Sequence, residues 1–401
     1  MLRSLFSGIS GLRAHQTMLD VTGNNISNVN TAGFKASQVQ FQDTLSQVLS
    51  NAGAPQDGVG GTNAAQVGLG VKVAGITTSF QQGAAQLTNR ATDMMISGDG
   101  FFVVDKGGEQ LYSRAGAFSF DALGQLVTPD GGLVQGWSAD AAGRIDLNSP
   151  LMGLRLPVST LMGATPSTSA VYQGNLPADA AVGTVLNRQI DVFDGAGGAR
   201  AMNLAFTRTA AGWDIAGVIA GTGSTQTGSI AFTTEGAISA LDFGPFPAAA
   251  GGGSSAIAVD LTALTGFAGL ETVAATSQDG RSAGTLQSFA INSDGTVLGS
   301  FSNGLKQAIG RVALANFANP SGLEKSGSSL FAPTVNSGDA QVGAAGTGGR
   351  GTLAGGSLEM SNVDLSAEFT NLIVAQRGFQ ANSRVITTSD EVLQELVNLK
   401  R

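Results

Sequence analysis

Residues 365–401 carry a seven-residue repeat of large apolar side chains, and this repeat constrains the fold more than any other feature of the chain. The repeat consists of Leu365, Leu372, Phe379, Ile386 and Leu393, and the same stripe is extended by Phe369 and Val397. A spacing of seven places side chains on one face of a helix and is typical of coiled coils. We therefore expect a long C-terminal helix whose apolar stripe packs against another helix.

A second apolar stripe lies at the opposite end of the chain, with an alternating spacing of three and four. Its members are Leu2, Leu5, Ile9, Leu12, Leu19 and Ile26. Gly8, Gly11 and Gly23 each weaken an isolated helix by about 1 kcal/mol relative to Ala, so this helix needs a partner to persist. We expect it to end within residues 28–33, where Gly33 suits a left-handed cap. Two ordinary core helices of one globular domain remain an alternative.

The residues between the two stripes predict β structure. Runs typical of strands occur at 94–96, 101–104, 189–193 and 288–291. Asp-Gly pairs favour tight hairpin turns, because both residues tolerate positive φ, and they begin at Asp57, Asp99, Asp130, Asp194, Asp279 and Asp294. We predict a mainly β, multi-domain protein with long terminal α-helices that form a coiled-coil-like stem.

Changes in composition predict that the domains are nested and discontinuous. Glycine-rich stretches lie next to each terminal helix, no lysine occurs between Lys106 and Lys306, and strand patterns resume after Gly284. The predicted units are a terminal helical core (1–35 plus 365–401), a connector (36–70 plus 335–364), a split β domain (71–145 plus 285–334) and an inserted outer β domain (146–284).

Side chains for catalytic or metal chemistry are scarce. The chain has no Cys and a single His, His15, which excludes thiolate nucleophiles, disulfides and His-rich metal cages. We expect His15 to be a surface or interface residue. The segment 346–351 matches Gly-x-Gly-x-x-Gly, but no helix start follows it, so we predict a glycine loop. The Asp-Gly turns lack the full calcium-loop spacing. We therefore predict no enzyme, no cofactor and no metal site.

Charge and hydropathy exclude two further classes of partner. The formal net charge is −8, which argues against a protein that grips nucleic acid. No apolar run approaches the roughly 18 residues of a membrane span. Arg3 and Arg13 interrupt the first apolar residues, which do not resemble a cleavable secretory signal. We expect either a cytoplasmic protein or one that is exported without an ordinary signal.

Several stretches resemble the signatures of the rod–hook family of flagellar axial proteins. Residues 19–35 resemble the N-terminal signature, 98–102 and 112–118 a shared β module, and 358–365 with 376–386 the C-terminal signature. The motif residues within the two terminal signatures are Asn24, Asn25, Asn28, Gly33, Phe34, Ser361, Asn362 and Asp364. The stretches extend the resemblance over roughly 1–135 and 285–401, and residues 146–284 carry no motif that we can place.

The resemblance implies a subunit of a hollow helical homopolymer outside the cell, exported by the flagellar type III apparatus. It implies that the terminal helices line the core of the tube and that the tube, as a flexible universal joint, passes motor torque to the filament. The implied partners are further copies of the chain, the distal rod protein, the hook cap and the hook–filament junction proteins. The length favours a hook-type member over a distal rod subunit. A secreted β-rich adhesin or a phage-like structural protein is the remaining alternative.

Overall fold

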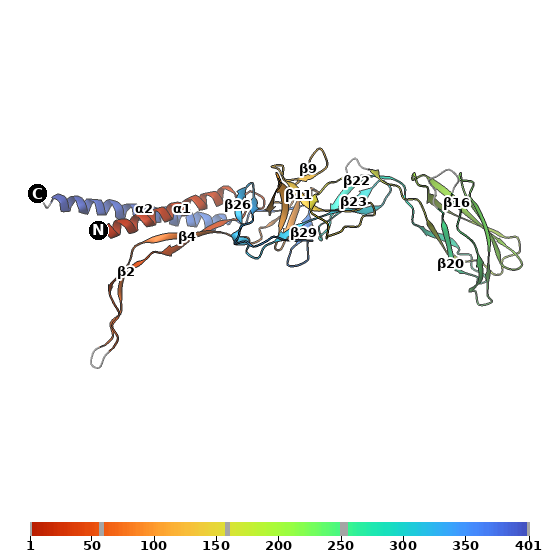
Figure 1. Cartoon of the computed structure of the whole chain (residues 1–401), viewed down its shortest axis with the longest axis horizontal. Helices are drawn as coiled ribbons and strands as arrows, with labels where there is room; N and C mark the ends of the chain where they lie inside the picture. Colours follow the sequence, from red (N-terminus) through yellow and green to blue (C-terminus); the bar gives the residue numbers. More distant parts are fainter. Residues whose placement is uncertain (1, 56–59, 157–160, 249–255, 399–401) are drawn as a thin grey trace.

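The computed structural model describes residues 2–55, 60–156, 161–248 and 256–398. The molecule is long and narrow, and its parts follow one another along one axis (Figure 1). Both chain ends lie at one end of the molecule, and the middle of the sequence lies at the other. The chain therefore runs outward through the parts of the molecule and then returns through them.

Two helices pack side by side at the end that holds the termini. Helix α1 spans Leu2–Ser27 and α2 spans Leu365–Asn398. Asp364 caps α2, because its Oδ1 accepts hydrogen bonds from the backbone N–H groups of Ser366 and Ala367. Helix α1 ends before the predicted segment 28–33, which forms turns and reaches Gly33 with φ at +68°. These helices, which we call the stem, confirm the predicted helical pair.

Residues 37–78, which fall largely in the predicted connector, form a long antiparallel ribbon that we call the arm. Strand β1 (Ser37–Asp43) pairs with β4 (Val71–Thr78) beside α1, and β2 (Ser46–Ser50) pairs with β3 (Ala65–Gly68) farther out. The outer half of the arm projects away from the stem (Figure 1).

The central body contains a 14-stranded sheet. Residues Phe101–Val104 form a continuous apolar run and are buried on both faces of this sheet, as expected for a central strand. The main path of the sheet runs through β13 (Leu161–Met162), β22 (Gly284–Ile291), β23 (Thr296–Phe301), β24 (Lys306–Val312), β11 (Leu133–Ser138), β7 (Phe101–Lys106), β8 (Glu109–Ser113), β27 (Leu330–Ala332) and β26 (Glu324–Gly327). Strands beside this path are β9 (Ser119–Phe120), β10 (Leu126–Val127), β12 (Met152–Gly153), β25 (Leu314–Asn316) and β28 (Gln341–Gly343), and a 3-10 turn, η1, spans Pro320–Gly322.

Two small sheets join the central body to the returning chain. Strand β6 (Met94–Ser97) pairs with β29 (Thr352–Gly355), and β5 (Ala85–Leu87) pairs with β30 (Ser357–Glu359). Each pair links residues that are far apart in the sequence. These pairings bring both halves of the chain together where the stem meets the central body.

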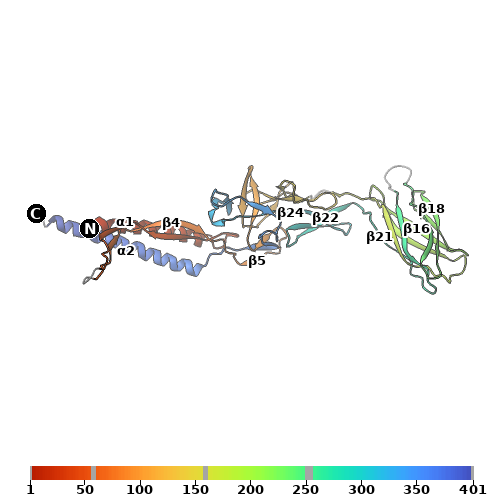
Figure 2. The ribbon, with the colours of Figure 1, turned by 60° about the horizontal axis from the view of Figure 1, so that its bottom comes forward.

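The far end of the molecule is a β-sandwich, which we call the outer sandwich (Figure 2). One sheet has the order β15 (Val185–Phe193), β16 (Ala199–Arg208), β17 (Trp213–Ile219), β18 (Thr225–Phe232) and β19 (Ile238–Asp242). The other sheet has the order β20 (Ala258–Thr265), β14 (Ser169–Asn175) and β21 (Ala274–Gln278). A core between the sheets buries Tyr172, Phe206, Trp213 and Phe246.

The hairpin prediction for the Asp-Gly pairs is correct at three positions and wrong at two. The turns at Asp130, Asp194 and Asp294 each join neighbouring antiparallel strands. Asp99 follows β6, which pairs with β29 and not with β7, and Asp279 lies where the chain leaves the outer sandwich for the central body. The pair at Asp57 lies outside the described residues. Asp-Gly permits a reversal of the chain, but long-range pairing decides which strands become neighbours.

The predicted fold class is confirmed: the protein is mainly β, has several parts, and carries a stem of packed terminal helices. In the described part of the chain, no helix is long and apolar enough to cross a membrane. The same residues contain no cluster of three or more potential metal ligands.

Candidate functional site: the helical stem and its neck

The two stem helices approach each other through small side chains. Gly8, Gly11 and Ala14 are buried in α1, and a Cβ added to Gly11 would lie 2.6 Å from Oδ1 of Asn382. A Cβ added to Gly378 would lie 2.5 Å from the ring of His15, so His15 is an interface residue. The glycines therefore permit the close approach of the two backbones.

The large apolar residues of the two predicted stripes flank this contact. The partly buried members are Leu5, Ile9, Leu12, Leu19, Ile26, Leu372, Phe379, Ile386 and Leu393. The exposed members are Leu365, Phe369 and Val397. The contact between α1 and α2 in one chain thus leaves much of the predicted apolar surface open to solvent.

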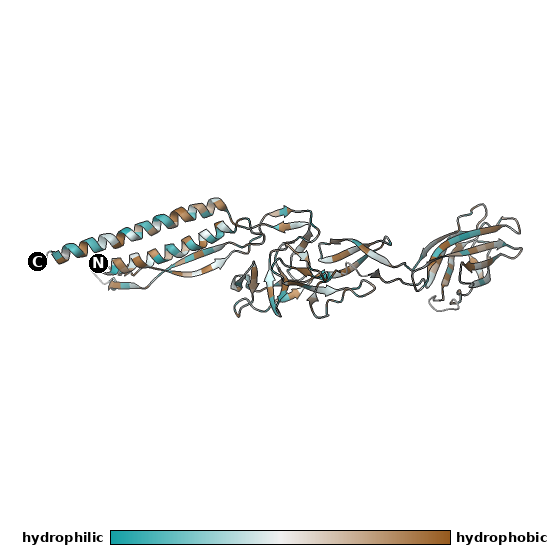
Figure 3. Cartoon of the chain, turned by 90° about the horizontal axis from the view of Figure 1, so that it is seen from above, coloured by the Kyte–Doolittle hydropathy of each residue, from teal (hydrophilic) through white to brown (hydrophobic). Residues whose placement is uncertain are grey.

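Helix α2 carries another apolar row that the sequence reasoning did not single out. Val374, Val385 and Val392 are exposed and stand 11 and 7 residues apart, and both spacings return to one helix face. Val385 and Val392 line a groove that also includes Ser4 of α1. Brown apolar segments along both helices are visible in Figure 3. Helix α2 therefore presents apolar residues on more faces than a single neighbouring helix can cover.

The outer half of the arm is also apolar and exposed. Every residue of β2 and β3 is exposed, and the exposed fractions of Leu45 and Leu49 are 83% and 61%. A two-stranded ribbon without a third layer is marginally stable in water. The arm thus presents a surface that a neighbouring molecule could stabilise.

A buried charge cluster lies at the neck, the junction of stem and central body formed by residues 33–37, 79–83, 114–115 and 359–362. Nζ of Lys35 lies 2.6 Å from Oε1 of Glu359, and Nε of Arg114 lies 3.2 Å from Oε2 of the same carboxylate. The side chains of Lys35 and Glu359 are fully buried. Burial lowers the pKa of Lys35, although the contact with Glu359 opposes this shift. Burial likewise lowers the pKa of Arg114.

Backbone groups supply further hydrogen bonds to this cluster, whereas Nε of Arg114 and Oε2 of Glu359 meet only as an ion pair. Lys35 donates to the carbonyl oxygen of Gln81, and the N–H of Gly83 donates to Oε1 of Glu359 at 2.8 Å. Arg114 donates to the carbonyl oxygens of Gly98 and Gly100. Buried ions are tolerated when their remaining groups are hydrogen-bonded. The cluster therefore ties the outgoing chain, the central body and the returning chain together.

Two motif asparagines reinforce the same junction. Nδ2 of Asn25 donates to the carbonyl oxygen of Ser37 and to Oε1 of Glu368 on α2. Asn362 accepts a hydrogen bond from the N–H of Ala36 and donates to the carbonyl oxygens of Ser79 and Gln81. A side-chain amide can donate and accept at once, so each asparagine joins several chain segments.

The other predicted motif residues shape the turn that enters the neck or the start of α2. Asn28 donates to Asn24 and accepts from Thr31, and Ser361 accepts from the N–H of Val363. The N–H of Gly33 donates to the carbonyl oxygen of Glu359 at 2.7 Å. Nζ of Lys325 lies over the ring of Phe34, 4.9 Å from the ring centroid. Asp364 is the α2 cap described above.

Sequence reasoning did not single out Lys35, Arg114 and Glu359, although each lies inside a stretch quoted for the family resemblance. Only 12% of the residues are charged, so a charged residue is uncommon in this chain. One charged member of the cluster in each of three family stretches is therefore the signal that could have indicated a buried charge network. Their partnership itself depends on contacts between distant segments.

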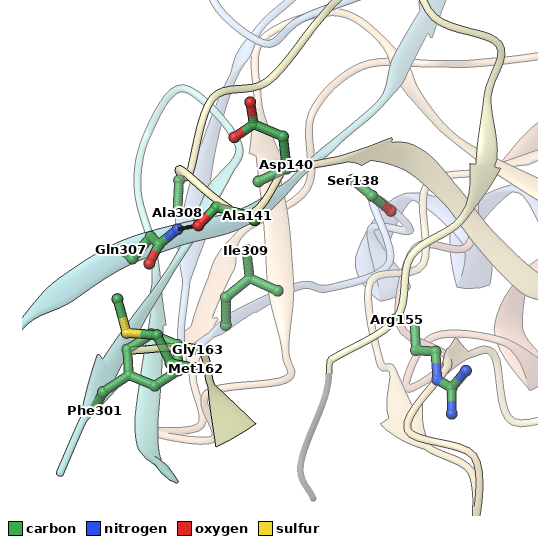
Figure 4. A pocket seen from close by; sticks show the side chains of 11 residues that line it. Ser138, Asp140, Ala141, Arg155, Met162, Gly163, Phe301, Gln307, Ala308 and Ile309 are labelled. Carbon is green, nitrogen blue, oxygen red and sulfur yellow. Dashed lines mark hydrogen bonds between the residues drawn. The ribbon is translucent and has the colours of Figure 1, made fainter. Parts of the chain in front are cut away.

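A cleft of about 490 Å³ lies in the central body, where residues of β11, β13, β23 and β24 line it (Figure 4). Its lining includes Asp140, Arg155 and Gln307, and Gln307 donates to the carbonyl oxygen of Ala141. The carboxylate of Asp140 already accepts hydrogen bonds from two backbone N–H groups of its own turn.

The Gly-x-Gly-x-x-Gly segment at 346–351 forms turns and leads into β29 rather than a helix, which excludes the dinucleotide-binding geometry.

Three features define the class of this protein. The chain runs outward through its parts and returns through them, its terminal helices pack as a stem, and the stem leaves apolar faces open to solvent. Such a protein is a subunit of a fibrous or tubular assembly. Three family models match the chain. Residues 5–35 match "Flagella basal body rod protein", 95–165 match "Flagellar hook protein FlgE/F/G D1 domain", and 354–399 match "Flagellar basal body rod FlgEFG protein C-terminal".

Full-length relatives carry the same family names. The chain is 40% identical to the flagellar hook protein FlgE of Borreliella burgdorferi, with 100% of both chains covered. It is 36% identical to FlgE of Salmonella typhimurium, covering 99% of this chain and 100% of that protein. It is also 36% identical to the basal-body rod protein FlgG of Bacillus subtilis over 100% of both chains. The chain belongs to the flagellar hook and basal-body rod protein family.

The fold has a solved counterpart in a crystal structure of the Helicobacter pylori flagellar hook protein FlgE2. The TM-score is 0.53 at 14% identity, with 69% of this chain and 100% of that chain covered. Family membership makes the protein a structural component of the flagellum, as the motifs predicted, and sets aside the adhesin and phage-like alternatives. Because the FlgG relative is matched over its full length, length alone does not separate hook from rod.

Proposed function

We propose that this protein is the hook subunit that self-assembles into a hollow helical tube and passes motor torque to the filament. The observation that carries the proposal is the unfilled apolar surface of the stem. Helix α1 covers one face of α2, yet Ile373, Val374 and Val385 of α2 remain exposed. Repeating one contact between unlike surfaces, with a rotation that does not close, generates a helical polymer.

Burying this apolar surface between subunits would contribute a substantial free energy to assembly. Fully burying a Val, Leu or Ile side chain is worth about 1.5–3 kcal/mol. Half-exposed Ile373, Val374, Val385 and Val392 would therefore contribute on the order of 4 kcal/mol per subunit when neighbours cover them. The exposed apolar residues of the arm add to this driving force.

The remaining parts of the proposal follow from the same assembly. The predicted site residues of the two stripes, Leu5 to Ile26 and Leu365 to Val397, form the packed core of the tube, and the predicted nested domains form its outer layers. The protein is exported through the flagellar type III apparatus to the outside of the cell. It contacts the distal rod protein, the hook cap and the hook–filament junction proteins at the ends of the tube.

Val385→Asp tests the assembly surface, because it places a charge on the exposed apolar row of α2 without touching the β parts. We expect soluble monomers with unchanged circular dichroism and no tubes by negative-stain electron microscopy. Thr387→Asp is the matched control and is expected to assemble, because it adds the same charge at an exposed position two residues away, on the opposite side of α2. Normal tubes from Val385→Asp would refute the role of this row.

A distal rod subunit is the second candidate, and the full-length match to the FlgG relative favours it. Immunogold labelling of purified hook–basal bodies separates the two functions. We expect label along the curved hook, whereas label confined to the rod would favour the second candidate.

A further inference from the structure

Two segments of the chain join the central body to the outer sandwich (Figure 1). The outgoing segment, residues 163–168, follows β13, and the returning segment, residues 279–283, precedes β22. Thr165 and Arg281 pair across the two segments, because the backbone N–H of each donates to the carbonyl oxygen of the other. We call the two segments the connector. Its contacts with the central body restrict how the outer sandwich can move.

Asn303, in the turn between β23 and β24, holds the connector from the side of the central body. Its Nδ2 donates to the carbonyl oxygen of Ser282 at 3.0 Å and lies 3.7 Å from the sulfur of Met162. Its Oδ1 accepts from the N–H of Leu305 at 3.2 Å, which fixes the orientation of the side-chain amide. A Cβ added to Gly284 would lie 2.9 Å from Cγ of Asn303, so the returning chain runs directly against this amide.

Arg281 makes a second, longer contact between the connector and the central body. Its Nη2 lies 3.4 Å from the carbonyl oxygen of Ala141, which is longer than the usual range of an N–H···O hydrogen bond. The side-chain amide of Asn303 is therefore the closer of these two ties, and the position of the connector depends on it.

Asn303 also belongs to the only Asn-Gly pair in the sequence. Glycine has no Cβ, so its backbone nitrogen can approach the preceding side chain closely. The nitrogen of Gly304 can attack Cγ of Asn303, forming a new C–N bond in a cyclic succinimide, while the side-chain nitrogen leaves as ammonia. Water then opens the ring and gives aspartate or isoaspartate. The reaction needs no enzyme, metal or oxidant.

The folded turn controls the rate of this reaction. The N–H of Gly304 donates to the carbonyl oxygen of Phe301 at 2.9 Å, and this bond and those of the Asn303 amide must open before the attack. Ser302, Gly304 and Leu305 are exposed, and exposed turns open locally without unfolding of the protein. The reaction therefore proceeds through local openings, more slowly than in an unfolded chain.

We propose that Asn303 is a site of spontaneous deamidation and that its conversion releases the connector from the central body. An ionised carboxylate only accepts hydrogen bonds, so the product has no donor for the carbonyl oxygen of Ser282. Two oxygen atoms, one of them charged, would then face each other, which is unfavourable. In the self-assembled tube proposed above, this change loosens the outer layer as the subunits age.

Peptide mapping by mass spectrometry tests the modification in the full-length protein at alkaline pH. The same chain in denaturant is the reference, and the Asn303→Gln variant, whose longer side chain disfavours the ring closure, is the control. We expect Asn303 to convert before the other asparagines and within about a hundredfold of the rate in denaturant. A folded chain that stays unmodified beyond this time, or converts no faster than the Asn303→Gln control, would overturn the site.

The Asn303→Asp variant reproduces the aspartate product and tests its consequence. Native-state hydrogen exchange at the amides of Thr165 and Arg281 reports the opening of the connector, and we expect about tenfold faster exchange from the loss of one hydrogen bond. Asn148→Asp makes the same change at an exposed residue of the central body and should leave these amides unchanged. Equal exchange in the two variants would overturn the release of the connector. Neither experiment requires tubes, so failure of the proposed function would not affect these results.

Discussion

Replacing Glu359 by Gln removes the only carboxylate that contacts Lys35 and Arg114 among the ion pairs of the described residues. The substitution preserves the shape of the side chain but leaves two buried cations close together. Breaking a buried ion pair by removing one partner costs about 3–5 kcal/mol. We therefore expect Glu359→Gln to open the neck while the outer sandwich, whose core is separate, keeps its stability.

Two further variants make this magnitude specific to charge. Lys35→Met leaves Arg114 paired with Glu359. The cluster of two cations and one carboxylate thereby becomes neutral, and we expect a smaller cost of about 2 kcal/mol. Asp130→Asn breaks the pair between Lys106 and Asp130, whose side chains are 42% and 24% exposed. An exposed pair of this kind contributes at most about 1 kcal/mol.

Native-state hydrogen exchange measures the effect where it occurs. The amides of Gly33 and Gly83 donate to Glu359 and report the opening of the neck. A loss of 3–5 kcal/mol corresponds to exchange that is faster by about two to four orders of magnitude. Amides of β16 serve as the internal reference and should keep their rates. The reasoning is refuted if Glu359→Gln accelerates the neck amides no more than Asp130→Asn does.

Two other predictions concern backbone conformation and pH. Gly33→Ala places a Cβ against the backbone of Ala115 at a residue with φ of +68°, so we expect a lower Tm. Gly23→Ala adds a Cβ where nothing lies within 4 Å and should raise the free energy of unfolding by up to about 1 kcal/mol. Equal shifts of Tm in calorimetry would contradict this difference between the two glycines. Burial alone would raise the pKa of Asp279, but hydrogen bonds from Thr168 and Ser169 outweigh it and leave the pKa below its ordinary value. The unfolded chain then binds more protons, so this contribution is present above about pH 4 and is lost as the pH falls through the folded pKa. Trp213 fluorescence between pH 6 and 2 should show less acid sensitivity for Asp279→Asn, and an unchanged pH profile would count against this sign.

Local patterns in the sequence determined the elements that depend on neighbours a few residues away. The seven-residue spacing from Leu365 to Leu393 predicted α2, because side chains at this spacing share one helix face whatever the rest of the chain does. The turns at Asp130, Asp194 and Asp294 were predictable for the same reason. The family stretches identified the class of protein before any contact was known.

Tertiary structure decided the features that require distant residues to meet. Lys35 and Glu359 are separated by 324 positions, and no periodicity indicates that they share a buried site with Arg114. The turn at Asp99 failed as a hairpin because β6 finds its partner in the returning chain at β29. The contact between the two stem helices likewise depends on Gly11 meeting Asn382 across the helices. Hydrophobic spacing predicts which helix faces are apolar. Which small side chains let the two backbones approach is decided by the packing of the two helices.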